Sequence, residues 1–65
     1  MKVTYDPVVD VLRIKLTSAA IDESDETHPG VILDFDTEGG IVGIEILDAS
    51  KRVEQPNTYE YAIAA

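Results

Sequence analysis

Cysteine is absent from this 65-residue sequence, and histidine occurs only once. The lack of cysteine excludes disulfide bridges and thiolate metal sites. A chain of this length buries only about 60% of the surface that its unfolded form exposes, and domains this small usually take extra stability from disulfides, a metal or a partner subunit. We therefore expect a homodimer or a higher homo-oligomer. The absence of cysteine also fits a reducing compartment, and we expect a cytoplasmic protein.

Basic residues are scarce: the sequence has five, against thirteen acidic residues, which gives a formal net charge of -8 and an isoelectric point of about 4.2. The five bases are Lys2, Arg13, Lys15, Lys51 and Arg52. Because phosphate groups attract basic surfaces, this balance argues against direct binding of nucleic acid or of an anionic membrane surface. A basic protein partner, cations or simple solubility remain as roles for the acidic surface.

Long apolar segments are also missing. The first residues, MKVTYDP, resemble neither a secretory signal nor a membrane span. We expect a single small β domain over residues 1–55 and a tail of uncertain structure over residues 56–65. Tyr59, Tyr61 and Ile63 alternate as in a strand, but Tyr59 and Ile63 are also four residues apart, as on a helix.

The richest β pattern is VILDFDTEGGIVGIEIL, residues 31–47, which we interpret as the central hairpin of a small sheet. Side chains in a strand alternate between two faces, so the register of the hairpin decides which residues share a face. Either a two-residue turn at Glu38-Gly39 or a four-residue turn over residues 37–40 makes one face wholly apolar, whereas a three-residue turn mixes the two faces. The hydrophobic pattern therefore favours the even turn. Its pairs are Phe35 with Val42, Leu33 with Ile44, and Val31 with Ile46.

Apolar alternation predicts further strands over residues 2–5 and 8–16. Residues 21–27 hold four acids in five positions and fit either an acidic edge strand or a loop. Asp48 is the expected N-cap of one helical turn over residues 48–52. The predicted fold class is mostly β: a small antiparallel sheet of four or five strands in meander order, with a short helical turn after Leu47.

One face of the predicted sheet is apolar and too wide for a single helical turn to cover. An exposed patch of this size normally marks an interface, and we expect copies to pack sheet on sheet. The predicted interface residues are Leu12, Ile14, Leu33, Phe35, Val42, Ile44 and Ile46, and Leu16 and Val31 lie on the same face.

Four acids match the spacing of an EF-hand calcium loop: Asp34, Asp36 and Glu38 before Gly39, and Glu45 at the closing position. An EF-hand needs a helix on either side, whereas the flanking residues here are rich in β-branched side chains. We therefore expect a polar turn, with no bound metal or cofactor. Asp34, Asp36, Glu38 and Glu45 remain weak candidates for a divalent-cation site.

No nucleophile and base stand in a pattern that predicts catalysis. Ser18, Ser24 and Ser50 lack the glycine-flanked turn of a hydrolase nucleophile. The single histidine, His28, comes directly before Pro29-Gly30, which is typical of a turn residue. We expect no catalytic residues and no enzymatic activity.

Several stretches together resemble a small prokaryotic family, catalogued as domain of unknown function 2283. They are Tyr5-Asp6-Pro7 with Asp10, the run from Pro29 to Asp36, and the run from Gly43 to Arg52. The resemblance covers the chain to about Arg52 and leaves out the tail. It implies a compact, mostly antiparallel β unit with no established activity and no catalytic residues to transfer. Members also look like the antitoxin half of proposed toxin–antitoxin pairs, beside small ribonuclease-like toxins.

Two functions follow from these observations. The favoured one is a non-enzymatic protein-interaction and oligomerisation module, antitoxin-like towards a basic partner. The alternative is a divalent-cation-binding or cation-dependent hydrolytic unit that uses the acidic hairpin from Asp34 to Glu45.

Overall fold

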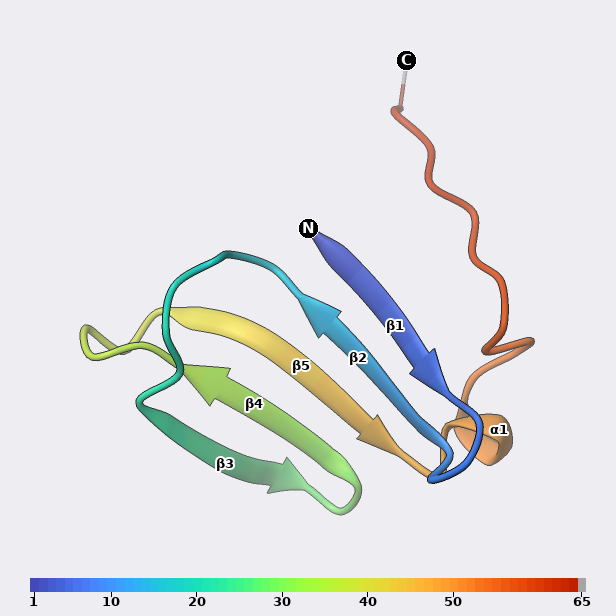
Figure 1. Ribbon diagram of the computed structural model, residues 1–65, viewed down its shortest axis with the longest axis horizontal. Helices are drawn as coiled ribbons and strands as arrows, with labels where there is room; N and C mark the ends of the chain where they lie inside the picture. Colours follow the sequence, from blue (N-terminus) through green and yellow to red (C-terminus); the bar gives the residue numbers. More distant parts are fainter. Residues whose placement is uncertain (65) are drawn as a thin grey trace.

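The computed structural model describes residues 1–64, which form one five-stranded antiparallel sheet and one short helix (Figure 1). The elements are β1 (Lys2–Asp6), β2 (Val11–Lys15), β3 (Glu23–His28), β4 (Val31–Phe35), β5 (Ile41–Leu47) and α1 (Ala49–Arg52). The mostly β fold, the antiparallel sheet and the helical turn after Leu47 are therefore confirmed. The acidic segment is a strand at the edge, as one of the two expectations had it.

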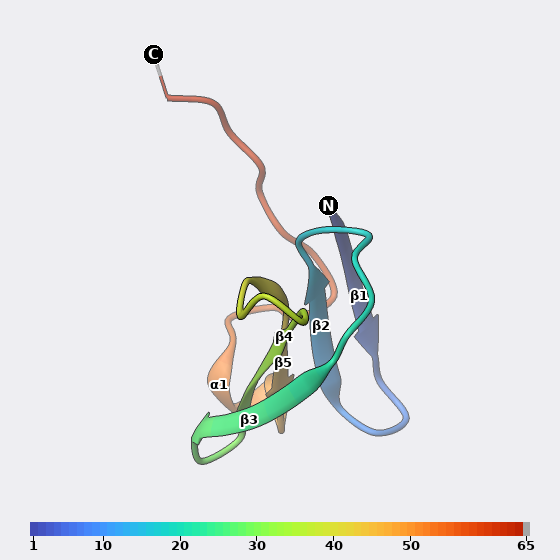
Figure 2. The ribbon, with the colours of Figure 1, turned by 90° about the vertical axis from the view of Figure 1, so that its left-hand side faces the viewer.

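The strand order is β1-β2-β5-β4-β3, so the expected meander order is wrong. β2 pairs with β5 rather than with β3, and residues 16–22 cross one face of the sheet to reach the far edge (Figures 1 and 2). The physical reason lies in composition. Every residue of β3 is exposed and three of its six are acidic, which suits an edge. β5 is mainly aliphatic, and at the centre of the sheet it pairs with a strand on each side.

The turn between β4 and β5 has three residues, Thr37–Gly39, so the predicted even turn is wrong. Asp36 N donates to Gly40 O at 2.9 Å and closes the loop, and the side chain of Asp36 accepts from the backbone N–H groups of Glu38 and Gly40. Gly39 has φ of +81°, a conformation that glycine adopts without strain.

A β-bulge then restores the register that the apolar pattern requires. Phe35 pairs with Ile41, but the next pair is Asp34 with Gly43, so Val42 is the extra residue. The predicted pairs Leu33–Ile44 and Val31–Ile46 are confirmed, whereas Phe35–Val42 is wrong.

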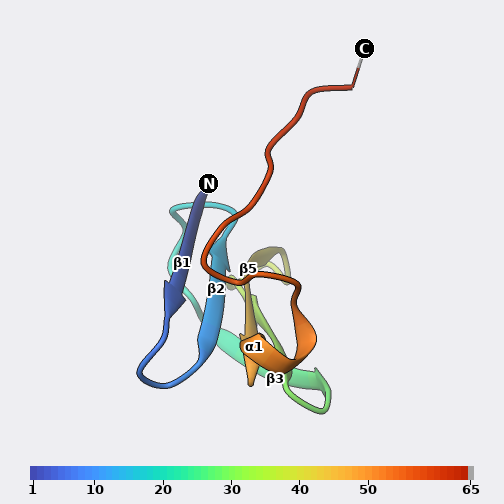
Figure 3. The ribbon, with the colours of Figure 1, turned by 90° about the vertical axis from the view of Figure 1, so that its right-hand side faces the viewer.

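The two faces of the sheet are covered by different segments. α1 lies on one side and the crossing residues 16–22 lie on the other (Figures 2 and 3). The buried hydrophobic residues of the described chain are few: Val11, Leu12, Val42 and Ala49. Most of the aliphatic side chains of the sheet therefore remain half-buried in the single chain.

Candidate functional site

The register brings most of the predicted interface residues onto one sheet face, called here the apolar face. Across the sheet, paired residues on this face are Val3 with Ile14, Tyr5 with Leu12, Ile14 with Ile44, Leu12 with Ile46, Leu33 with Ile44, and Val31 with Ile46. No charged residue occupies these positions of the four strands. Glu23 and Asp25 of the edge strand border the face, because they pair with Phe35 and Leu33.

Exposure differs among the predicted interface residues. Leu12 and Val42 are buried, at 8% and 2% exposed, so neither offers much surface to a partner. The half-buried members are Ile14, Leu33, Phe35, Ile44 and Ile46. Leu16 is exposed and lies just past the end of β2. The apolar face is thus partly shielded and partly open.

The shield is the segment that follows β5. Ala49 of α1 is completely buried, and a groove of about 270 Å³ lies between this segment and the first two strands. The groove is lined by Met1, Val3, Leu12 and Ile14 on the sheet side, and by residues from Val53 to Tyr61 on the other side. The apolar face therefore continues into an open groove beside β1.

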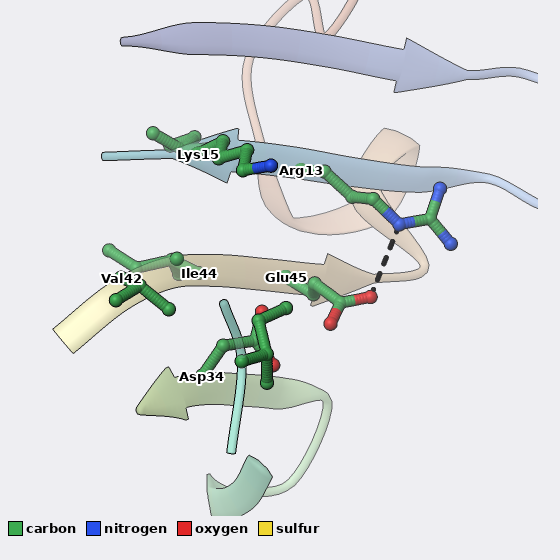
Figure 4. Close-up of a pocket in the computed structure, with 9 residues that line it drawn as sticks. Arg13, Lys15, Asp34, Val42, Ile44 and Glu45 are labelled. Carbon is green, nitrogen blue, oxygen red and sulfur yellow. Dashed lines mark hydrogen bonds and ion pairs between the residues drawn. The ribbon is translucent and has the colours of Figure 1, made fainter. Parts of the chain in front are cut away.

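The opposite face carries the charged residues Arg13, Lys15 and Glu45 and a smaller pocket of about 180 Å³, which Ile21 of the crossing segment helps to line (Figure 4). Arg13 Nε donates to Glu45 Oε1 at 3.2 Å across the β2–β5 pair. Asp34 is only 4% exposed, and its carboxylate accepts a 2.6 Å hydrogen bond from Ser24 Oγ. Burying a carboxylate requires such a partner.

The four acids of the predicted cation site are not brought together. Asp34 accepts a hydrogen bond from Ser24, and Glu45 forms an ion pair with Arg13. Asp36 accepts hydrogen bonds from backbone N–H groups of its own turn. Glu38 is exposed at the tip of that turn. Across residues 1–64, no group of three or more metal-binding side chains is arranged to hold an ion.

A polar junction joins the first turn to the helix. Asp10 Oδ1 accepts from Tyr5 Oη at 2.7 Å and from Ser50 N at 2.9 Å, and its Oδ2 accepts from Ser50 Oγ at 2.6 Å. The backbone oxygen of Asp10 also accepts from Ala49 N at 3.0 Å. Asp10 therefore caps α1 from 40 residues away in sequence.

The sequence predicts Asp48 as the N-cap, and Asp48 does occupy that position, but its side chain does not cap the helix. Asp48 has φ of +52° and makes no side-chain capping bond. Asp10 also has a left-handed backbone, with φ of +57°, and this conformation ends the turn before β2. β2 therefore begins at Val11 and not at Val8 as predicted.

The junction changes the acidity of both titratable members. The hydrogen bond from Ser50 Oγ, followed by that from Tyr5, holds the pKa of Asp10 below its usual value, because both favour the carboxylate. The bond to Asp10, with burial as a smaller cause, raises the pKa of Tyr5. Asp10 is therefore charged and Tyr5 neutral near neutral pH, which keeps the junction closed.

The family model described as Protein of unknown function (DUF2283) matches residues 2–50, three quarters of the chain. The chain belongs to this DUF2283 family. The match contains all five strands and both sides of the Asp10–Ser50 junction, whereas the tail lies beyond it. No curated protein and no solved structure matches the chain. Within residues 1–64, no helix combines the length and the apolar character needed to cross a bilayer.

Proposed function

We propose that this DUF2283 protein is a non-enzymatic protein-interaction and oligomerisation module, and that the apolar face is its binding surface. One observation carries the proposal: Ile14, Leu33 and Ile44 lie next to one another in register, are uncharged and keep part of their surface open. Contiguous apolar side chains that stay partly open to solvent are typical of interaction sites.

The charge of the molecule supports a basic partner. The net charge of -8 lies outside the apolar positions, and the edge strand next to the apolar face carries Glu23, Asp25 and Glu26. Opposite charges around an apolar contact speed association and select the partner. A small basic protein, such as the toxin of an antitoxin-like pair in the cytoplasm, has the complementary chemistry.

The test compares two neighbouring residues of β4 that point to opposite faces, Leu33 and Ile32. Both are half-buried, so Leu33→Lys and Ile32→Lys make the same chemical change on different faces. The tagged protein is co-expressed with the product of the adjacent gene, and binding is measured on the purified pair. We expect Leu33→Lys to weaken binding by about a hundredfold, because a charge is buried at the contact. Ile32→Lys should bind like the unmodified chain.

Circular dichroism establishes that both variants keep the sheet. Equal loss of binding in the two folded variants contradicts the proposed surface. A folded chain that stays monomeric and binds neither itself nor a basic protein contradicts the proposed function.

A further inference from the structure

The C-terminal tail, defined here as residues 58–64, begins beside the groove and then leaves the body of the molecule as an extended segment (Figures 1 and 3). Tyr59, Tyr61 and Ile63 are 65%, 70% and 87% exposed. These three residues alternate along the chain, so an extended tail carries them on one side. An apolar strip thus projects from a molecule that has an open apolar groove.

We propose that the tail of a second copy fills this groove, so that two chains exchange tails in a symmetric dimer. The inference rests on the proposed function and names the occupant of the groove into which the apolar face continues. The groove is floored by Val3, Leu12 and Ile14, and the chain's own tail forms its other wall. A second tail packed between them covers the floor and the apolar strips of both tails.

The exposed area agrees with a missing partner of this size. The chain exposes 4972 Å², whereas a folded monomer of 7.1 kDa is expected to expose about 4,100 Å². The excess of about 900 Å² is close to the area of about 800 Å² that each partner buries in a standard interface. The projecting tail contributes to this excess, which is the surface that exchange removes.

The length of the tail suits a contact with a second copy. Gln55 has φ of +48° and is followed by Pro56; Pro56 and residues 58–61 line the groove, and the tail then extends beyond the level of the N-terminus (Figure 3). Seven extended residues span about 23 Å, which is enough to run beside a whole strand of a neighbouring sheet. In a twofold dimer, one such contact is made twice.

The absence of cysteine permits a direct test with single-cysteine chains. One chain carries Tyr61→Cys and the other Val3→Cys, so a disulfide between them forms only across two copies. Thr4→Cys is the matched control, because Thr4 adjoins Val3 and faces the other side of the sheet. After mild oxidation we expect a covalent dimer from Tyr61→Cys with Val3→Cys, and at least about tenfold less with Thr4→Cys.

Oligomeric state is measured by light scattering on the full chain and on a tail variant, Tyr59→Ser with Tyr61→Ser and Ile63→Ser. We expect the full chain to be a dimer at micromolar concentration, and the tail variant to dimerise at least about a hundredfold more weakly. Glu60→Gln, a polar change in the same segment, should leave the dimer intact.

Three results overturn tail exchange. They are a monomeric full chain, a dimer that the tail variant does not weaken, and equal cross-linking at Val3→Cys and Thr4→Cys. The second of these leaves the proposed function in place, because copies then associate through the apolar face without the tail. A monomer that still binds a basic protein through Leu33 also removes the exchange and keeps the proposed function.

Discussion

Asp10 shows how much one side chain can organise in a small protein. Its carboxylate and backbone oxygen together hold Tyr5, Ala49 and Ser50, which come from a strand and from the first turn of the helix. Hydrogen bonds to an ionised acceptor are stronger than those between neutral groups. The left-handed backbone at Asp10 and the cap on α1 are therefore parts of one arrangement.

The lowered pKa of Asp10 makes the junction sensitive to acid. A carboxylate with a lowered pKa stabilises the fold above its unfolded value of 3.8, and this contribution is lost as pH falls through the lower folded value. We expect Asp10→Asn to lower the melting temperature by about 5 °C at neutral pH. The difference from the unmodified chain should shrink as the solution is acidified below the unfolded pKa.

Thermal unfolding followed by circular dichroism, at neutral pH and at about pH 3, measures this difference. Asp48→Asn is the control, because it removes the same charge from a residue that makes no capping bond. A pH-independent difference for Asp10→Asn would show that its charge does not matter.

The raised pKa of Tyr5 affects stability in the alkaline range. Its contribution to the stability of the fold is complete below 10.0 and is lost as pH rises through the folded pKa.

At the scale of elements, the β4–β5 hairpin combines two local preferences that conflict. The Asp36 turn with Gly39 requires three residues, and the apolar pattern requires the register of a turn with an even length. The bulge at Val42 satisfies both, since one extra residue shifts the pairing back by one. Val42 is also the largest fully buried side chain of the described residues.

Gly39 provides a test of the turn. Its φ of +81° suits glycine, and no atom lies within 4 Å of where a Cβ would be, so a substitution there tests backbone conformation rather than space. We expect Gly39→Val to lower the free energy of unfolding by about 1–2 kcal/mol. Gly39→Asn should cost less, because asparagine tolerates the left-handed region. Urea unfolding of the two variants measures the difference, and equal losses would contradict this account.

Much of the hairpin could be predicted from the sequence, because alternation alone identifies Leu33–Ile44 and Val31–Ile46 as partners. The strand order could not. The residues of β2 alone do not determine whether β3 or β5 pairs with it. That choice depends on which of the two strands takes the central position of the sheet. The same alternation of apolar residues predicts the apolar face as a candidate site. The Asp10 cap was not, because it depends on a contact between residues far apart in sequence.

At the scale of the whole molecule, charge and apolar surface act against each other. Two copies with a net charge of -8 each repel, while the apolar face and the tail favour contact. A basic partner removes that repulsion. The response to salt therefore distinguishes a second copy from a basic protein as the occupant of the apolar face.

We expect the homodimer to tighten severalfold as salt is raised from about 0.05 to about 0.5 M, because screening reduces the repulsion between like charges. Binding of a basic protein should weaken over the same range. Sedimentation equilibrium measures the dissociation constant of the homodimer, and calorimetry measures that of the complex with the basic protein. A homodimer that weakens with added salt would show that polar contacts, and not the apolar face, hold it together.

The central position of β5 has a consequence for biosynthesis. β5 follows the other four strands of the sheet in the sequence, yet it joins the β1–β2 half of the sheet to the β3–β4 half. Until it has emerged from the ribosome, the nascent polypeptide consists of two separate hairpins, and an isolated hairpin is marginally stable in water. We therefore expect the sheet to form only after β5 has emerged, and unfinished chains to expose unpaired strand edges until then.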